Sequence, residues 1–137
     1  DCRVKISSSE VSANGTGARF KGGEGQILMS RFVNNRETAL HLSGARMKIQ
    51  RCRFADNSRD AIRLEDGRAL ISGNIFSSNF GFNLYNAGRE DLNALLNWWG
   101  SSDQAIITQK IHDAVLDPRS GTVQVFPWLT EKPPLIP

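Results

Sequence analysis

The chain has 137 residues, of which 39% are hydrophobic and 23% charged, and its formal net charge at pH 7 is +3. This length and composition fit one folded domain and exclude a disordered chain. No apolar run approaches the ~18–20 residues of a membrane helix, so no transmembrane segment is expected. The chain begins at Asp1 without a signal peptide, which predicts a processed protein or the C-terminal part of a longer one.

Positive charge is concentrated in the first half of the chain. Residues 1–68 contain 13 Lys and Arg against 8 Asp and Glu, a net charge of +5, and residues 69–137 contain 4 against 6, a net charge of −2. This asymmetry favours an anionic partner. It also fits an ordinary solvated surface that uses arginine.

Three segments of the chain repeat with a period of 22 residues, namely 27–42, 49–64 and 71–84. Apolar and polar residues alternate in them over strand-length pieces, and Asn, Gly and Ser separate these pieces. Stacked turns of such strands form an all-β parallel β-helix, here of about five to six turns. The matching sets are Phe32, Phe54 and Phe76; Asn35, Asn57 and Asn79; Ile27, Ile49 and Ile71; and Ser30, Cys52, Asn74 and Asn97.

The recurring Asn and Phe residues predict two structural ladders. Asn tolerates the left-handed backbone of a bend, and its amide can bond the Asn of the next turn. The Phe rings are expected to stack in the core.

The regular repeat ends at residues 97–100, Asn-Trp-Trp-Gly. Residues 1–100 are expected to form the solenoid turns, and residues 101–137 a cap that covers the last sheet edge and includes a final strand at 122–126. Cap packing is assigned to Asn97, Trp98, Trp99 and Trp128, with a sugar-stacking platform as the alternative for the tryptophans.

A short helix is predicted in this cap. Ser101 and Gln104 have the spacing of a capping box. Ile107 and Ile111 follow at helical intervals, and Pro118 ends the helix because the residue before a proline disfavours helical geometry.

The two cysteines are expected to be free thiols. The period places Cys2 and Cys52 about two turns apart, ~10 Å at the strand spacing, whereas a disulfide needs Cα atoms within ~7 Å. Cys52 is interpreted as a small buried residue rather than a nucleophile.

The repeat resembles a known family. The Ile-x-x-Asn-x-Phe-x-x-Asn pattern of residues 71–79 looks like the repeats of right-handed parallel β-helix proteins, the pectin-lyase-like fold. Residues 97–100 and Pro127-Trp128-Leu129 resemble the terminal segment of bacterial secreted members. The resemblance implies the fold and an extracytoplasmic location, but no single activity, because this fold carries lyases, hydrolases, epimerases, adhesins and inert scaffolds.

The catalytic sets of those enzymes are incomplete in this sequence. The polygalacturonase-like group brings paired aspartates, Gly-His-Gly and Arg-x-Lys. This sequence has no Asp-Asp and no Gly-His-Gly, and its Arg3-Val4-Lys5 has no acidic or His partner motif around it. No catalytic residue is assigned, and a lyase or hydrolase, or its C-terminal fragment, stays the alternative. Pectate lyases gather carboxylates around calcium. In this sequence the acidic residues closest together are Asp56, Asp60, Glu65 and Asp66, and they have no equivalents in the adjacent turns.

No metal site and no other cofactor are expected. Some β-helix proteins with similar repeats take part in copper insertion. Copper prefers soft ligands such as Cys and Met, and this sequence contains both residue types. Core packing is nevertheless the preferred interpretation of Met47 and Cys52, and the histidines His41 and His112 lie on different elements.

Three pairs of basic residues also recur at the 22-residue interval. Stacking would place the members of each pair ~4.8 Å apart, where two like charges cost ~1 kcal/mol in water. An elongated anion lying along these residues would neutralise the repulsion between them, so the pairs predict a basic face that binds acidic polysaccharide. The alternative is a structural scaffold whose duplicated repeats inherited Arg. No nucleic acid is expected, because no aromatic residues interleave with the arginines. The pairs are Arg31 and Arg53, Arg46 and Arg68, and His41 and Arg63.

The first turn would expose an open sheet edge. Either preceding turns or self-association through this N-terminal end is expected to cover it.

Overall fold

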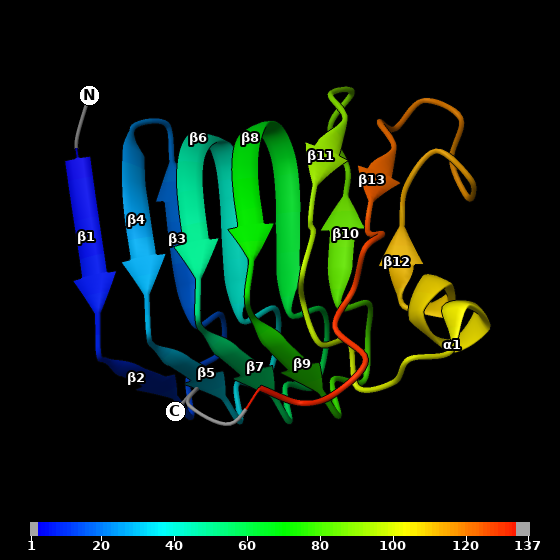
Figure 1. Cartoon of the computed structure of the whole chain (residues 1–137). Helices are drawn as coiled ribbons and strands as arrows, with labels where there is room; N and C mark the ends of the chain where they lie inside the picture. Colours follow the sequence, from blue (N-terminus) through cyan, green and yellow to red (C-terminus); the bar gives the residue numbers. More distant parts are fainter. Residues whose placement is uncertain (1–2, 134–137) are drawn as a thin grey trace.

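The structure is a computed structural model that describes residues 3–133, and it is a parallel β-solenoid (Figure 1). The elements are β1 (Arg3–Ser7), β2 (Glu10–Ser12), β3 (Ala18–Lys21), β4 (Glu24–Leu28), β5 (Arg31–Val33), β6 (Leu40–Gln50), β7 (Arg53–Ala55), β8 (Ile62–Ser72), β9 (Ile75–Ser77), β10 (Leu84–Asn86), β11 (Leu92–Asn93), α1 (Gln104–Gln109), β12 (Ile111–His112) and β13 (Val123–Gln124). The predicted fold class is confirmed.

Each turn of the solenoid has three sides. A four-stranded bottom sheet has the order β2-β5-β7-β9. The other nine strands form one sheet with a bend, because β6 and β8 each pair along two separate stretches. We call its two parts the front sheet (β1, β4, Ala45–Gln50 of β6, Gly67–Ser72 of β8, β11 and β13) and the rear sheet (β3, Leu40–Ser43 of β6, Ile62–Glu65 of β8, β10 and β12).

The corners between the sides repeat a left-handed backbone conformation with φ between 47° and 82°. L-residues adopt this region at a cost, and Gly, Asn and Asp do so most readily. The sequence interpretation put the ladder asparagines there, and this is wrong by one position: the left-handed residue precedes each of them. The three corners hold Ser8, Met29, Arg51, Gly73 and Leu96; Ala13, Asn34, Asp56, Ser78 and Gly100; and Gly22, Gly44 and Asp66.

Inside the turns, the phenylalanines stack along the axis as expected. The ring centroids of Phe32 and Phe54 are 5.0 Å apart, and those of Phe54 and Phe76 are 5.2 Å apart. All three side chains are fully buried. Trp99 extends this stack, with its ring 4.5 Å from that of Phe76. The core therefore contains one continuous aromatic column, which ends in a tryptophan and is surrounded by aliphatic side chains.

The predicted Asn ladder is also present. Nδ2 of Asn35 donates to Oδ1 of Asn57 at 3.0 Å, and Nδ2 of Asn57 donates to Oδ1 of Asn79 at 2.9 Å. A second buried ladder occupies the slot of Ser30, Cys52, Asn74 and Asn97. There, Oδ1 of Asn97 accepts from the backbone N–H of Asn74, and Oδ1 of Asn74 accepts from that of Cys52.

The last turns differ from the prediction. The solenoid has about four turns, not five or six, because the chain after residue 100 forms α1, two short strands and loops. The helix spans only Gln104–Gln109, because Ile111 pairs with Leu84 as a strand of the rear sheet. Its N-cap is Asp103, whose side chain accepts from Ala105 N. The final strand is Val123–Gln124, shorter than expected.

Candidate functional site

The three predicted pairs of basic residues are in register but do not share one face. Arg31 lies beside Arg53 on the bottom sheet. The other two pairs lie on the two parts of the bent sheet, Arg46 beside Arg68 on the front sheet and His41 beside Arg63 on the rear sheet. The expectation of a single basic face is wrong, because a corner or the bend lies between these positions in every turn.

Three of the four residues in the pairs on the bottom and rear sheets lie next to acids; for the fourth, Arg53, no ion pair is found within residues 3–133. Arg31 Nη1 lies 3.4 Å from a carboxylate oxygen of Glu10. Arg63 lies 3.1 Å from Glu65, and its guanidinium stacks 4.2 Å above the Tyr85 ring. Nε2 of His41 lies 3.5 Å from the same Glu65 carboxylate. The hydrogen bond from Arg63 is the main cause that lowers the pKa of Glu65.

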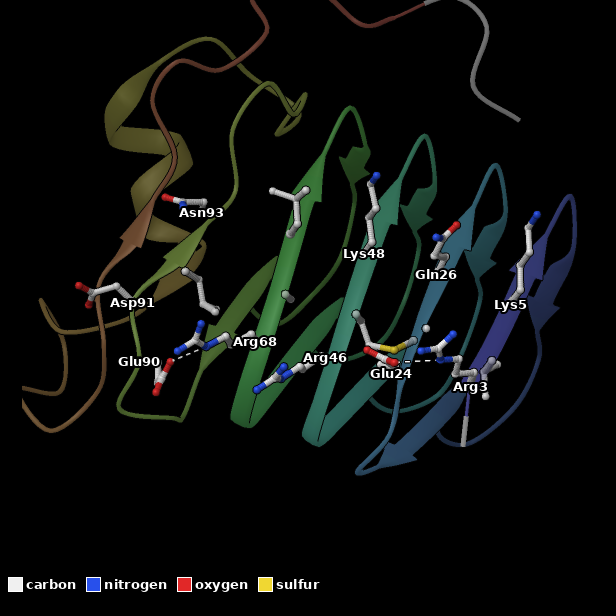
Figure 2. Close-up of a pocket in the computed structure, with 16 residues that line it drawn as sticks. Arg3, Lys5, Glu24, Gln26, Arg46, Lys48, Arg68, Glu90, Asp91 and Asn93 are labelled. Carbon is white, nitrogen blue, oxygen red and sulfur yellow. Dashed lines mark hydrogen bonds and ion pairs between the residues drawn. The ribbon is translucent and has the colours of Figure 1, made fainter. Parts of the chain in front are cut away.

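The front sheet carries an elongated groove of about 940 Å³ that crosses β1, β4, β6, β8 and the β11 region (Figure 2). Alternate side chains of these strands point outward, so the groove has two parallel rows of side chains. The first row is Arg3, Glu24, Arg46 and Arg68, and the second row is Lys5, Gln26, Lys48, Leu70 and Asn93. Glu90 and Asp91 lie beyond Arg68 at the end of the first row.

Charge in the groove is positive at its centre. The lining includes five cations and three carboxylates, a net charge of +2. In the first row, Arg3 pairs with Glu24 at 3.0 Å, and Arg68 pairs with Glu90 at 3.0 Å. Within residues 3–133, no ion pair is found for Arg46, or for the second-row Lys5 and Lys48. These three cations are consequently available to a ligand.

Sequence reasoning found Arg46 and Arg68 but missed the rest of the groove. Lys5 and Lys48 lie at the same position of turns two apart, but Gln26 stands between them. A search for identical residues in adjacent turns cannot detect such a row. Writing the turns one above another and marking the outward positions of the front sheet would have revealed it.

The four acidic residues that the sequence places within one turn do not form a cluster in the structure. Asp60 and Glu65 both contact Arg63, whereas Asp56 and Asp66 lie at two different corners. Across the described part of the chain, no group of three or more His, Cys, Asp or Glu side chains is arranged to hold a metal ion.

Three of the remaining candidates, Trp99, Trp128 and Cys52, lie in or against the core. Trp99 is buried on Phe76 and Trp128 packs against the core, so they do not form a sugar platform together. Cys52 is a buried free thiol, and burial raises its pKa to about 11, which makes it a poor nucleophile. Cys2 lies outside the described residues.

The three-sided parallel turns define a β-solenoid protein. A family model described as "Right handed beta helix region" matches residues 1–109, and the chain belongs to this family. Comparisons with curated proteins and with solved structures found no match. Within residues 3–133, no helix has the length and apolarity needed to cross a membrane.

Proposed function

We propose that this chain is a non-catalytic, extracytoplasmic β-helix domain that binds acidic polysaccharide in the front groove. The observation that carries the proposal is a set of three cations, Lys5, Arg46 and Lys48, in one groove that follows the solenoid axis; none of them has an ion pair with another residue of the described range 3–133. An extracytoplasmic location agrees with a polysaccharide ligand and with the likeness of the terminal segment to secreted proteins.

The shape of the groove favours an extended chain over a compact ligand. It crosses five neighbouring strands, so it offers a series of contacts at steps of ~4.8 Å. Each exposed ion pair in such a site contributes only ~0.2–1 kcal/mol. A long anion that makes several contacts at once is therefore the ligand that gains measurable affinity, and its binding should weaken with salt.

Charge reversal within the groove tests the proposal. The double variant Arg46→Glu/Lys48→Glu should lose salt-sensitive binding to acidic polysaccharide in a pull-down assay at low and high salt. The matched control is Arg31→Glu/Arg53→Glu, which makes the same charge change on the bottom sheet and should retain binding. Equal binding by both variants would show that the groove is not the site.

The same incubations decide between a binding domain and an enzyme. New reducing ends or unsaturated products would favour the carbohydrate-active alternative, a lyase or hydrolase. Binding without new chain ends supports the proposal.

Self-association through the N-terminal end is a second candidate. Within residues 3–133, β1 and β2 each pair with a strand on one side only, and the core residues Ile6, Val11 and Phe20 of this turn are only partly buried. A second copy of the chain would cover both features. Sedimentation of the wild type and of Val11→Lys tests this: a wild-type dimer that the variant loses supports it, and a monomer at all concentrations excludes it.

A further inference from the structure

The unpaired cations of the groove lie on alternate strands. In the second row, Lys5 is on β1, Gln26 on β4 and Lys48 on β6, and they are in register with one another. Figure 2 shows these three side chains in a line across the strands. Two strand spacings separate Lys5 from Lys48, which is about 10 Å.

The strand between them presents no free positive charge. Gln26 is neutral, and its first-row neighbour Glu24 is negative and engaged by Arg3 at 3.0 Å. An anionic group placed over β4 would face the Glu24 carboxylate, and like charges this close repel each other. The Gln26 amide can instead donate to and accept from hydroxyl groups of a neutral sugar.

The strand on the other side of Lys48 is also free of unpaired charge. Arg68 is held by Glu90 at 3.0 Å, and the second-row residue is Leu70, which is 45% exposed. An exposed leucine offers an apolar contact to the ring face of a sugar, but no contact to a carboxylate. The sequence of surfaces along the axis is therefore cationic, neutral, cationic and neutral over β1, β4, β6 and β8.

From this spacing we infer that the groove selects polysaccharides in which acidic and neutral sugars alternate. In an extended polysaccharide, one sugar advances by nearly the distance between two strands. Acidic groups on every second sugar would then meet Lys5 and the Arg46–Lys48 pair, and neutral sugars would cover Gln26 and Leu70. This inference rests on the proposed function, because it concerns the ligand of the same groove.

Calorimetric titration with two oligosaccharides of equal length tests the inference. The probes are hyaluronan hexasaccharide, with an acid on every second sugar, and hexagalacturonate, with an acid on every sugar. Hyaluronan should bind about five-fold more tightly, the ratio that one avoided like-charge contact at the surface corresponds to. Non-specific attraction would give the opposite order, because hexagalacturonate carries more negative charge.

A single added charge should change this preference. Gln26→Lys supplies the missing cation on β4 and should improve hexagalacturonate binding until it equals or exceeds that of hyaluronan. The matched control Gln109→Lys adds the same charge at an exposed position of α1, outside the groove, and should leave the order unchanged.

The possible outcomes separate the inference from the proposed function. Wild-type protein that prefers hexagalacturonate, with binding abolished by Arg46→Glu/Lys48→Glu, overturns the alternation inference and leaves the groove as the binding site. Failure of the wild type to bind either probe overturns both. Preference for hyaluronan that Gln26→Lys reverses and Gln109→Lys does not supports both.

Discussion

Replacing Asn57 by Ala tests how much the buried amide ladder stabilises the solenoid. The Asn57 side chain is fully buried and takes part in four hydrogen bonds. Nδ2 donates to Oδ1 of Asn79 at 2.9 Å and to the carbonyl of Phe32 at 3.0 Å. Oδ1 accepts from the backbone N–H and from Nδ2 of Asn35 at 3.1 and 3.0 Å. Both N–H donors and both acceptor lone pairs of the amide are thus used within the protein.

The expected loss follows from these four bonds. Each contributes ~1 kcal/mol net, which gives ~4 kcal/mol, and the partners left unpaired in the core cannot turn to water. We therefore expect Asn57→Ala to lower the free energy of unfolding in urea by about 3–5 kcal/mol. Asn93→Ala makes the same change at an exposed residue whose side chain makes no hydrogen bond within residues 3–133, and it should stay within ~0.5 kcal/mol of the wild type. A loss below ~1 kcal/mol at Asn57 would refute the reasoning.

The variant Asn57→Asp adds a pH dependence to the same test. Its second carboxylate oxygen would face two acceptors, the Phe32 carbonyl and Oδ1 of Asn79, in place of the donor Nδ2. Burial and these acceptors raise the pKa of the new carboxyl in the folded state above the ordinary value of ~3.9. Between those two pKa values the folded state binds more protons than the unfolded state, so stability rises as the pH is lowered. Urea unfolding at pH 4 and pH 7 measures this, and a variant that is more stable at pH 7 contradicts it.

Three other predictions concern single titratable groups. The Cys52 thiol is fully buried and has a pKa of about 11, so it should resist alkylation by iodoacetamide at pH 8 in the folded protein and react in urea. Mass spectrometry measures both rates of alkylation, and equal rates would contradict the burial of this thiol. The pKa of Glu65 is lowered from 4.5 in the folded state, so its stabilising contribution exists above that pH and is lost as the pH falls through the folded-state pKa. Glu65→Gln should therefore cost less than ~1 kcal/mol at pH 7, and this cost should shrink as the pH is lowered below 4.5, whereas a pH-independent cost would exclude the linkage. Lys110 donates from Nζ to backbone carbonyls of residues 79–81 at 2.7 and 3.0 Å, so Lys110→Met should lower the free energy of unfolding by ~2 kcal/mol, and the same exchange at the exposed Lys132 should have little effect.

The interior of the fold could be predicted from the sequence because the solenoid repeats its buried residues. Phe32, Phe54 and Phe76 recur at one interval, and parallel pairing brings equal positions of successive turns together. A stacked ring or amide is stabilised most by an identical residue in the next turn. Residues that recur in the sequence are therefore also the residues that touch in the core. Trp99 escaped this reasoning because it differs from Phe and follows at an interval of 23 residues.

The exterior could not be predicted in the same way. Lys5, Gln26 and Lys48 lie in register, but nothing in the packing requires them to be alike. The predicted cap helix is present, but its C-terminal end was predicted too late. The spacing of Ile107 and Ile111 fits a helix, whereas the backbone of Ile111 pairs with Leu84 in the rear sheet. Tertiary pairing decided the structure there, and local spacing does not contain that information.

The hydrogen bonds of the amide ladder all run in one direction along the solenoid axis, and the ladder ends at a defined residue. Each amide in it donates toward the following turn and accepts from the preceding one, so any turn that carries the same Asn can be inserted between two others. At Asn79 the donor turns instead to Asn83 within its own turn, at 3.0 Å, and no further copy is required. Gene duplication of one 22-residue unit upstream of this point would lengthen the protein and its groove by one strand spacing without a new interface having to evolve.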